Sequence, residues 1–158
     1  EHVLVYHNDP TGLVGLLEAL GECREVSFIA YNFEPPPDAA TRLPNVTFKR
    51  PDVEGFLADL AAARAVIATA GYTLTSEALW LGKPLLVLPN GGIFEQTLNA
   101  IMLEREGLGE AVMKGMPSAA RIREFLDRAR PRGRAEVVQC GNAAAADCIE
   151  RVLGEIRR

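Results

Sequence analysis

The sequence predicts an α/β domain in which a parallel β-sheet carries helices on both faces. Short apolar runs, typical of strands buried on both sides, alternate with segments whose apolar residues recur three or four positions apart. Glycine and proline turns separate the two kinds of segment. A length of 158 residues suits one domain with a substantial core, so residues 1–158 are expected to form a single unit.

The expected elements follow one another in a regular order. The expected strands are His2–Tyr6, Val26–Tyr31, Val46–Phe48, Ala65–Thr69, Leu85–Leu88 and, at an edge of the sheet, Ala111–Met113. Helical spacing is found at 13–20, 56–61, 74–81, 93–102, 122–129 and 145–156. A turn is expected at 8–12, and glycines end two of the helices. This alternation predicts a parallel sheet.

The helix that begins at Ile93 is expected to have two distinct faces. Its core-facing stripe is predicted to consist of Phe94, Leu98, Ile101 and Met102. Gln96 and Asn99 lie three positions apart, away from that stripe. The amide side chains are therefore expected to face a ligand or solvent.

Composition excludes several classes of protein. A net charge of −4 and an isoelectric point near 5.3 argue against a nucleic-acid binder. Cys23, Cys140 and Cys148 form no CxxC pair and have no metal-ligand spacing, which favours free thiols in a reducing, cytoplasmic setting. No apolar run reaches the roughly 18 residues of a membrane span, and no signal peptide is recognised. The chain starts at Glu1 without Met and is expected to be a fragment of a longer protein.

Polar residues gather at two loops that should lie at one edge of the sheet. Gly71 follows one buried strand, and Gly91 and Gly92 follow the next. Backbone N–H groups and helix N-termini collect at such an edge. Glu77 shares a helix face with Thr73, so its carboxylate should point toward the same crevice. A carboxylate, an amide pair and two glycine loops suit a polyol joined to a phosphate.

Three motifs in this region resemble a known family. They are GYTLTSEAL from Gly71, GKP from Gly82 and EQxxNA from Glu95. In this order they resemble the C-terminal domain of GT-B glycosyltransferases, with a pattern similar to the bacterial N-acetylglucosaminyltransferase of peptidoglycan lipid synthesis and its uncharacterised relatives. The resemblance implies a Rossmann-like parallel sheet that forms the C-terminal half of a GT-B architecture.

The resemblance also implies a nucleotide-sugar donor, usually a UDP-sugar, and assigns residues to its parts. Glu77 matches the acid that holds the ribose hydroxyls, and Gln96 and Asn99 match the residues that hold the sugar hydroxyls. Glu95, in the same motif, is expected to bind the substrate. The segment 71–73, with Gly71 and Thr73, would bring backbone N–H groups to the diphosphate, and Gly91 and Gly92 would leave a second loop open to the ligand. Arg50 lies in the loop 49–51, where the family's backbone recognises the base. His7 is a further phosphate donor or, the favoured reading, a loop residue that faces solvent.

The sequence departs from the family pattern at two places, and explanations of the site residues that involve no ligand remain open. Ala70 replaces a second glycine found in many members, and the loop at 7–12 lacks a glycine-rich run. Glu77 could simply favour its helix N-terminus, the amides could be solvated, and Gly71 could serve a tight turn. The arginines at 121–134 suit a solvated face or, less readily, an anionic membrane surface.

The function expected for the intact protein is sugar transfer. The acceptor hydroxyl would attack the anomeric carbon of a hexose-type sugar, without an obligate metal or other cofactor. The catalytic base and the unknown acceptor's site would belong to a missing N-terminal domain, so the fragment alone should be inactive. Two alternatives remain: half of a nucleotide-sugar epimerase, or a nucleotide-sensing or protein-binding module. A peripheral location on the inner membrane face is a further possibility.

Overall fold

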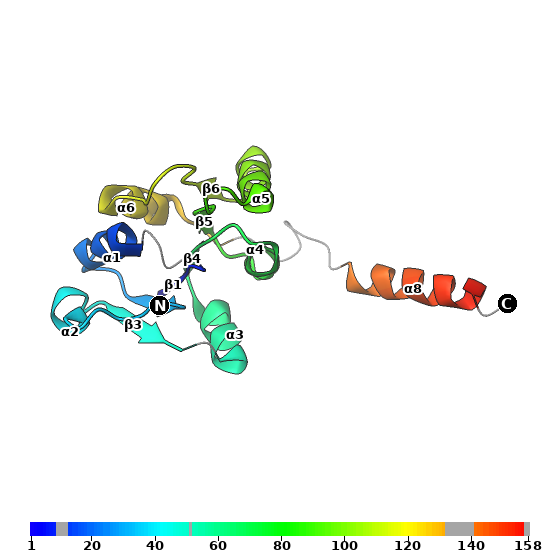
Figure 1. The fold of residues 1–158 in the computed structure, drawn as a ribbon, viewed down its shortest axis with the longest axis horizontal. Helices are drawn as coiled ribbons and strands as arrows, with labels where there is room; N and C mark the ends of the chain where they lie inside the picture. Colours follow the sequence, from blue (N-terminus) through cyan, green and yellow to red (C-terminus); the bar gives the residue numbers. More distant parts are fainter. Residues whose placement is uncertain (9–12, 51, 132–140, 157–158) are drawn as a thin grey trace.

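A computed structural model describes residues 1–8, 13–50, 52–131 and 141–156 of the chain. The turn expected at 8–12 therefore lies outside the described residues except for Asn8, as do Pro51, Cys140, Arg132 and Arg134. Every other element expected from the sequence can be compared with the structure (Figure 1).

The sheet has six parallel strands in the order β3-β2-β1-β4-β5-β6. The strands are β1 (Val3–Tyr6), β2 (Phe28–Tyr31), β3 (Val46–Lys49), β4 (Ala65–Ala68), β5 (Leu85–Val87) and β6 (Glu110–Ala111). Val3 pairs with Phe28 on one side and with Ala65 on the other. The chain thus builds outward from β1 to β3 and then returns to the other side of β1 with β4. Ligands bind at such a reversal of strand order in open α/β sheets, because the loops beyond the strand ends diverge there.

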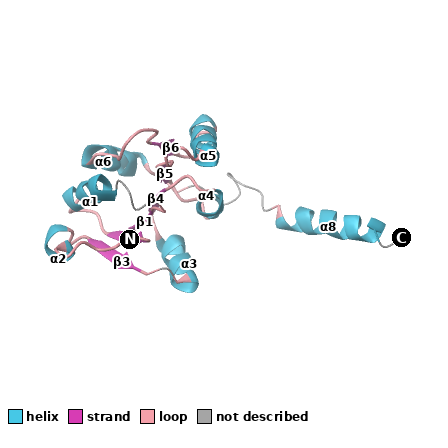
Figure 2. Ribbon diagram, in the orientation of Figure 1, coloured by secondary structure: helices cyan, strands magenta, loops and turns pink. Residues whose placement is uncertain are grey.

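Helices cover both faces of this sheet, as expected (Figure 2). The helices of the described residues are α1 (Leu13–Glu22), α2 (Ala39–Arg42), α3 (Val53–Ala62), α4 (Tyr72–Trp80), α5 (Phe94–Arg105), α6 (Ala119–Arg128) and α8 (Asn142–Ile156). Side chains alternate along the strands, so Val3 and Val5 join one core with α1 and α6 while Leu4 joins the other with α3, α4 and α5. The fold class expected from the sequence is confirmed.

The expected orientation of α5 is wrong. Phe94 is 79% exposed, and the other three residues of the predicted stripe, Leu98, Ile101 and Met102, are exposed as well. The buried face of α5 consists of Gln96, Ala100 and Leu103. These two sets lie on opposite sides of the helix, because 3.6 residues make one turn. The small side chain of Ala100 lets α5 approach the second core closely.

Smaller differences concern the edge of the sheet and the last helix. The edge strand lies at Glu110–Ala111 instead of Ala111–Met113, and α2 was not expected. The helix α8 forms where its spacing predicted it, yet none of its residues is buried, and Figure 1 draws it apart from the sheet. Among the described residues, no helix combines the length and the apolar character that a bilayer crossing requires.

Candidate functional site

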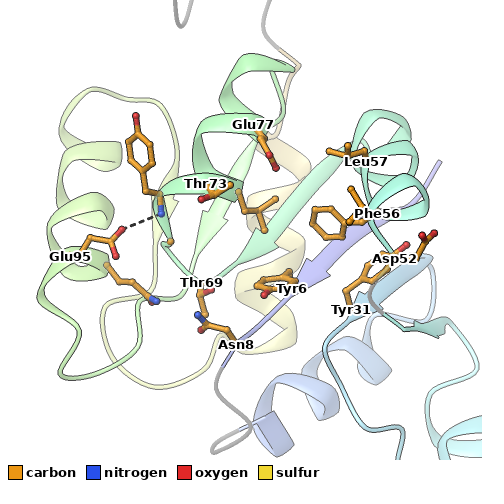
Figure 3. Close-up of a pocket in the computed structure, with 15 residues that line it drawn as sticks. Tyr6, Asn8, Tyr31, Asp52, Phe56, Leu57, Thr69, Thr73, Glu77 and Glu95 are labelled. Carbon is orange, nitrogen blue, oxygen red and sulfur yellow. Dashed lines mark hydrogen bonds between the residues drawn. The ribbon is translucent and has the colours of Figure 1, made fainter. Parts of the chain in front are cut away.

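A pocket of about 730 Å³ opens at the carboxyl ends of the strands, where the strand order reverses. It is lined by Tyr6, Asn8, Tyr31, Asp52, Val53, Phe56, Leu57, Thr69, Gly71, Tyr72, Thr73, Leu74, Glu77, Glu95 and Gln96. Figure 3 shows Glu77 and Thr73 on one side of the pocket and Phe56 and Tyr31 on the other. The pocket thus lies between the starts of α3 and α4, with α5 at its rim.

One wall of the pocket is aromatic. Tyr6 ends β1, Tyr31 ends β2, and Phe56 comes from the first turns of α3. The Phe56 ring meets the Tyr6 ring edge-on at 5.9 Å and the Tyr31 ring edge-on at 5.0 Å between centroids. Such edge-to-face packing is the favoured arrangement of aromatic rings and holds them in place. The wall offers a rigid apolar surface to a flat group.

A polar network behind this wall fixes Tyr31. The Tyr31 hydroxyl donates to Asp59 Oδ2 at 2.6 Å, and Lys49 Nζ donates to the same oxygen at 2.6 Å. Burial alone would raise the pKa of Asp59, but the hydrogen bonds from Lys49 and Tyr31 outweigh it and hold that pKa below its usual value. Burial, together with the neighbouring Asp59, raises the pKa of Tyr31. Tyr31 therefore stays a neutral donor, locked against a carboxylate.

The opposite wall is the N-terminus of α4. Gly71 precedes the helix and provides no side-chain cap, and the first helical bond runs from the Thr75 N–H to the Gly71 carbonyl at 3.2 Å. The N–H groups of Tyr72, Thr73 and Leu74 therefore have no acceptor inside the helix. Together with the helix dipole, these groups favour a negatively charged ligand.

The geometry at Gly71 argues against the tight-turn explanation. Its φ of −69° is available to any residue, and a β-carbon at this position would meet nothing within 4 Å. Neither the backbone nor the packing of the protein requires glycine here. The open space lies in front of the first turn of α4, so glycine leaves room for a ligand to approach the backbone. Gly92, by contrast, has a φ of +87°, which itself favours glycine.

The loop after β5 is held by amide side chains. Gln96 is 3% exposed, and its Oε1 accepts from the Asn90 N–H at 2.9 Å. The Asn90 side chain donates to Asn8 Oδ1 at 2.8 Å, which joins this loop to the loop after β1. Asn99 Nδ2 donates to the Ala70 carbonyl at 2.9 Å and to Glu95 Oε1 at 2.8 Å. The Gln96 and Asn99 side chains therefore hold the loops at the rim of the pocket in place.

The structure brings together half of the site residues expected from the sequence. Gly71, Thr73, Glu77, Glu95 and Gln96 line the pocket, whereas Gly91, Gly92, Asn99, Arg50 and His7 are not among the lining residues. Arg50 is exposed directly after β3.

The favoured expectation of a solvent-facing His7 is wrong. This residue directly follows β1 and is 2% exposed, and its backbone carbonyl accepts from Asn32 Nδ2 at 2.8 Å.

Several lining residues were missed by the sequence analysis. Tyr6, Tyr31 and Thr69 end strands or follow them directly, so their position at the carboxyl edge could have been anticipated. Asp52 caps α3, with its Oδ2 accepting from the Gly55 N–H at 2.8 Å. Phe56 gave no signal of its own, because its helical spacing matched an ordinary core position.

The charge of the lining is negative. Asp52, Glu77 and Glu95 line the pocket, and no lysine or arginine is among its described lining residues. Within the described ranges, no three His, Cys, Asp or Glu side chains cluster as they would around a metal ion. The positive potential available to an anion therefore comes from helix N-termini.

The arginines of α6 support the reading of a solvated face. Arg121 and Arg128 both bind Glu110, at 2.6 and 2.9 Å, and Arg123 binds Glu25 at 2.7 Å. Their charges are thus engaged by carboxylates of the same chain.

Known proteins share parts of this sequence. A family model described as Glycosyl transferase family 1 matches residues 1–130. An uncharacterised glycosyltransferase of Methanosarcina mazei is 34% identical over 105 residues, which cover 61% of this chain and 28% of that protein. The UDP-N-acetylglucosamine–N-acetylmuramyl-(pentapeptide) pyrophosphoryl-undecaprenol N-acetylglucosamine transferase of Thermotoga neapolitana is 31% identical over 116 residues, covering 72% of this chain and 33% of that protein.

Solved structures share the fold at low sequence identity. The glycotransferase of kitacinnamycin superposes with a TM-score of 0.63 at 18% identity, covering 80% of this chain and 34% of that one. Medicago truncatula UGT71G1, solved in complex with UDP-glucose, gives a TM-score of 0.57 at 21% identity, covering 79% of this chain and 31% of that one. The chain thus spans about a third of the length of the proteins it matches. With a Rossmann-like parallel sheet that matches GT-B glycosyltransferases, the chain belongs to glycosyl transferase family 1.

Proposed function

We propose that this chain is the C-terminal, donor-binding half of a GT-B glycosyltransferase and that it binds a UDP-sugar in the pocket at the strand reversal. The observation that carries the proposal is the start of α4, where the first-turn N–H groups have no acceptor inside the helix and the Glu77 carboxylate lines the same pocket. The N–H groups suit a diphosphate and the carboxylate suits a pair of ribose hydroxyls. The UDP and UDP-glucose complexes among the structural neighbours support this choice of ligand.

The remaining parts of the ligand are assigned by what the walls offer. The base would lie toward the aromatic wall, near Arg50 and the start of α3. The sugar would lie toward the loop after β5, where Gly91 and Gly92 leave the backbone open and Gln96 and Glu95 line the pocket. Asn99 would act on the sugar through Glu95, which it holds at 2.8 Å.

In the intact protein, an acceptor hydroxyl would attack the anomeric carbon of the donor. A bond from that oxygen to the carbon forms, the bond from the carbon to the diphosphate oxygen breaks, and the diphosphate leaves with the electron pair. The N-terminus of α4 stabilises the charge that develops on the leaving group. The acceptor site and the general base would come from a second, N-terminal domain.

Binding of UDP, UMP and uridine to the chain by titration calorimetry tests this proposal. UDP is expected to bind, and its affinity should fall in the order UDP, UMP, uridine as phosphates are removed. The chain alone is expected to transfer no sugar. Equal affinity for UDP and uridine would refute the diphosphate site, and sugar transfer by the chain alone would refute the division between two domains.

A further inference from the structure

Glu95 occupies an unusual place for an acidic side chain in a pocket proposed to bind a diphosphate. It comes from the first turn of α5, yet its Oε1 accepts from the Tyr72 N–H at 3.2 Å, across the gap to the start of α4 (Figure 3). Tyr72 is the first residue of α4, so its N–H is one of the donors at that helix terminus that have no acceptor inside the helix.

Glu95 is held there by a second contact. Asn99, one helical turn further along α5, donates from Nδ2 to Glu95 Oε1 at 2.8 Å, and the same amide nitrogen donates to the Ala70 carbonyl at 2.9 Å. Ala70 lies directly before Gly71, which supplies α4 with no side-chain cap of its own. The Glu95 carboxylate therefore satisfies a first-turn N–H of α4 that has no acceptor inside the helix.

We propose that the Glu95 carboxylate caps the N-terminus of α4 and competes there with the phosphate of the donor nucleotide. This inference rests on the proposed function, because it takes the start of α4 as the phosphate site. A carboxylate and a phosphate both seek the same N–H groups and the same helix dipole. Binding of the phosphate then requires Glu95 to release the Tyr72 N–H, or to tolerate a like charge beside it.

The competition should lower the affinity most for a ligand that ends in a phosphate, such as UDP. The last phosphate of UDP carries an extra ionisable oxygen, with a pKa of about 6 like the second pKa of a phosphate monoester, whereas the same phosphate in a UDP-sugar is esterified. No lysine or arginine among the described lining residues offsets the charge. Glu95 thus disfavours UDP more than UDP-sugar, which would favour the donor over the released product.

The variant Glu95→Gln tests this directly, because glutamine keeps an oxygen acceptor for the Tyr72 N–H and removes the charge. The variant is expected to bind UDP roughly two- to fivefold more tightly than the unmodified chain, the range for exposed charge pairs. UDP-glucose should gain less affinity than UDP or lose affinity, because the proposed function places Glu95 beside its sugar. Raising the salt from about 0.05 M to 1 M should shrink the difference, since the Debye length falls to about 3 Å.

The matched control is Glu106→Gln, which removes the same charge at the other end of α5, beyond its last turn. This control should leave the affinity for UDP unchanged, and thermal melting should show that both variants fold.

Each outcome separates the two proposals. Tighter UDP binding by Glu95→Gln but not by Glu106→Gln supports the competition. Equal or weaker UDP binding by Glu95→Gln, while the unmodified chain binds UDP, overturns it and leaves the proposed function intact. Failure of all three proteins to bind UDP would overturn the proposed function and this inference with it.

Discussion

Replacement of Glu77 is the sharpest test of the nucleotide pocket. Glu77 is half-buried, faces the pocket from the second turn of α4, and takes part in no side-chain hydrogen bond or ion pair among the described residues. The change Glu77→Ala therefore leaves no protein group without its partner. The expected effect on the free energy of unfolding is limited to the interaction of the carboxylate with the helix dipole, about 0.3–1 kcal/mol.

The expected loss of binding is larger than this loss of stability. Two hydrogen bonds from ribose hydroxyls to a carboxylate would each contribute about 1.5–3 kcal/mol, and solvent at a half-buried site lowers the sum. We expect UDP affinity to fall by about 1.5–3 kcal/mol, or roughly tenfold to 150-fold. Titration calorimetry measures the affinity, and thermal melting of the same samples shows that the fold is kept.

A double comparison makes the assignment to the ribose specific. The unmodified chain should bind 2′-deoxy-UDP less tightly than UDP, and Glu77→Ala should bind the two nucleotides equally. Equal UDP affinity in the variant and the unmodified chain would leave Glu77 with only its role at the helix end. If the substitution lowers the affinities for UDP and for 2′-deoxy-UDP by the same factor, the carboxylate contacts another part of the ligand.

Three further predictions concern the walls of the pocket. Gln96→Ala should lower the free energy of unfolding by about 1–3 kcal/mol, because it leaves the Asn90 N–H without its acceptor. It should also weaken binding of the UDP-sugar by about 1 kcal/mol more than binding of UDP. Equal losses for the two ligands in competition binding would refute the sugar contact. Gly71→Ala should keep or raise the melting temperature, since the φ of −69° suits alanine, yet it should weaken UDP binding. Gly92→Ala should lower the stability, because its φ is +87°. Unchanged UDP affinity in Gly71→Ala would mean that no ligand approaches this backbone. Asp59 has a pKa below its usual value, so its contribution to stability is present above the unfolded-state pKa of about 3.9 and is lost as the pH falls through the lower folded-state pKa. In denaturant titrations between pH 7 and pH 3, Asp59→Asn should therefore lose less unfolding free energy on acidification than the unmodified chain. Parallel pH profiles for the two proteins would contradict this.

The sequence by itself determined the order of strands and helices and part of the site. Short apolar runs such as Ala65–Ala68, bounded by turn residues, favour a strand covered on both faces, and their alternation with helices favours a parallel sheet. The relation of Gly71, Thr73 and Glu77 was also local, because residues one turn apart on a helix share a face whatever surrounds it. Their place in one pocket followed from the strand that precedes them.

Only the tertiary structure decided which face of α5 is buried. The helix carries Phe94 and Leu98 on one side and Ala100 and Leu103 on the other, so its periodicity allows either side to meet the sheet. The close approach to the second core selects the side with the smaller residue, and Gln96 is buried along with it. Periodicity fixes faces relative to one another within an element, but not the partner that each face meets.

The aromatic wall and the Glu95 contact depend on tertiary structure for the same reason. Tyr6, Tyr31 and Phe56 come from three elements, and Glu95 reaches Tyr72 across 23 positions of sequence. Contacts between elements depend on strand order and on the distance between helices, which local spacing does not encode. The sequence thus placed groups such as Gly71 and Glu77 at the carboxyl edge of the sheet, and the packing of the helices decided which groups meet there.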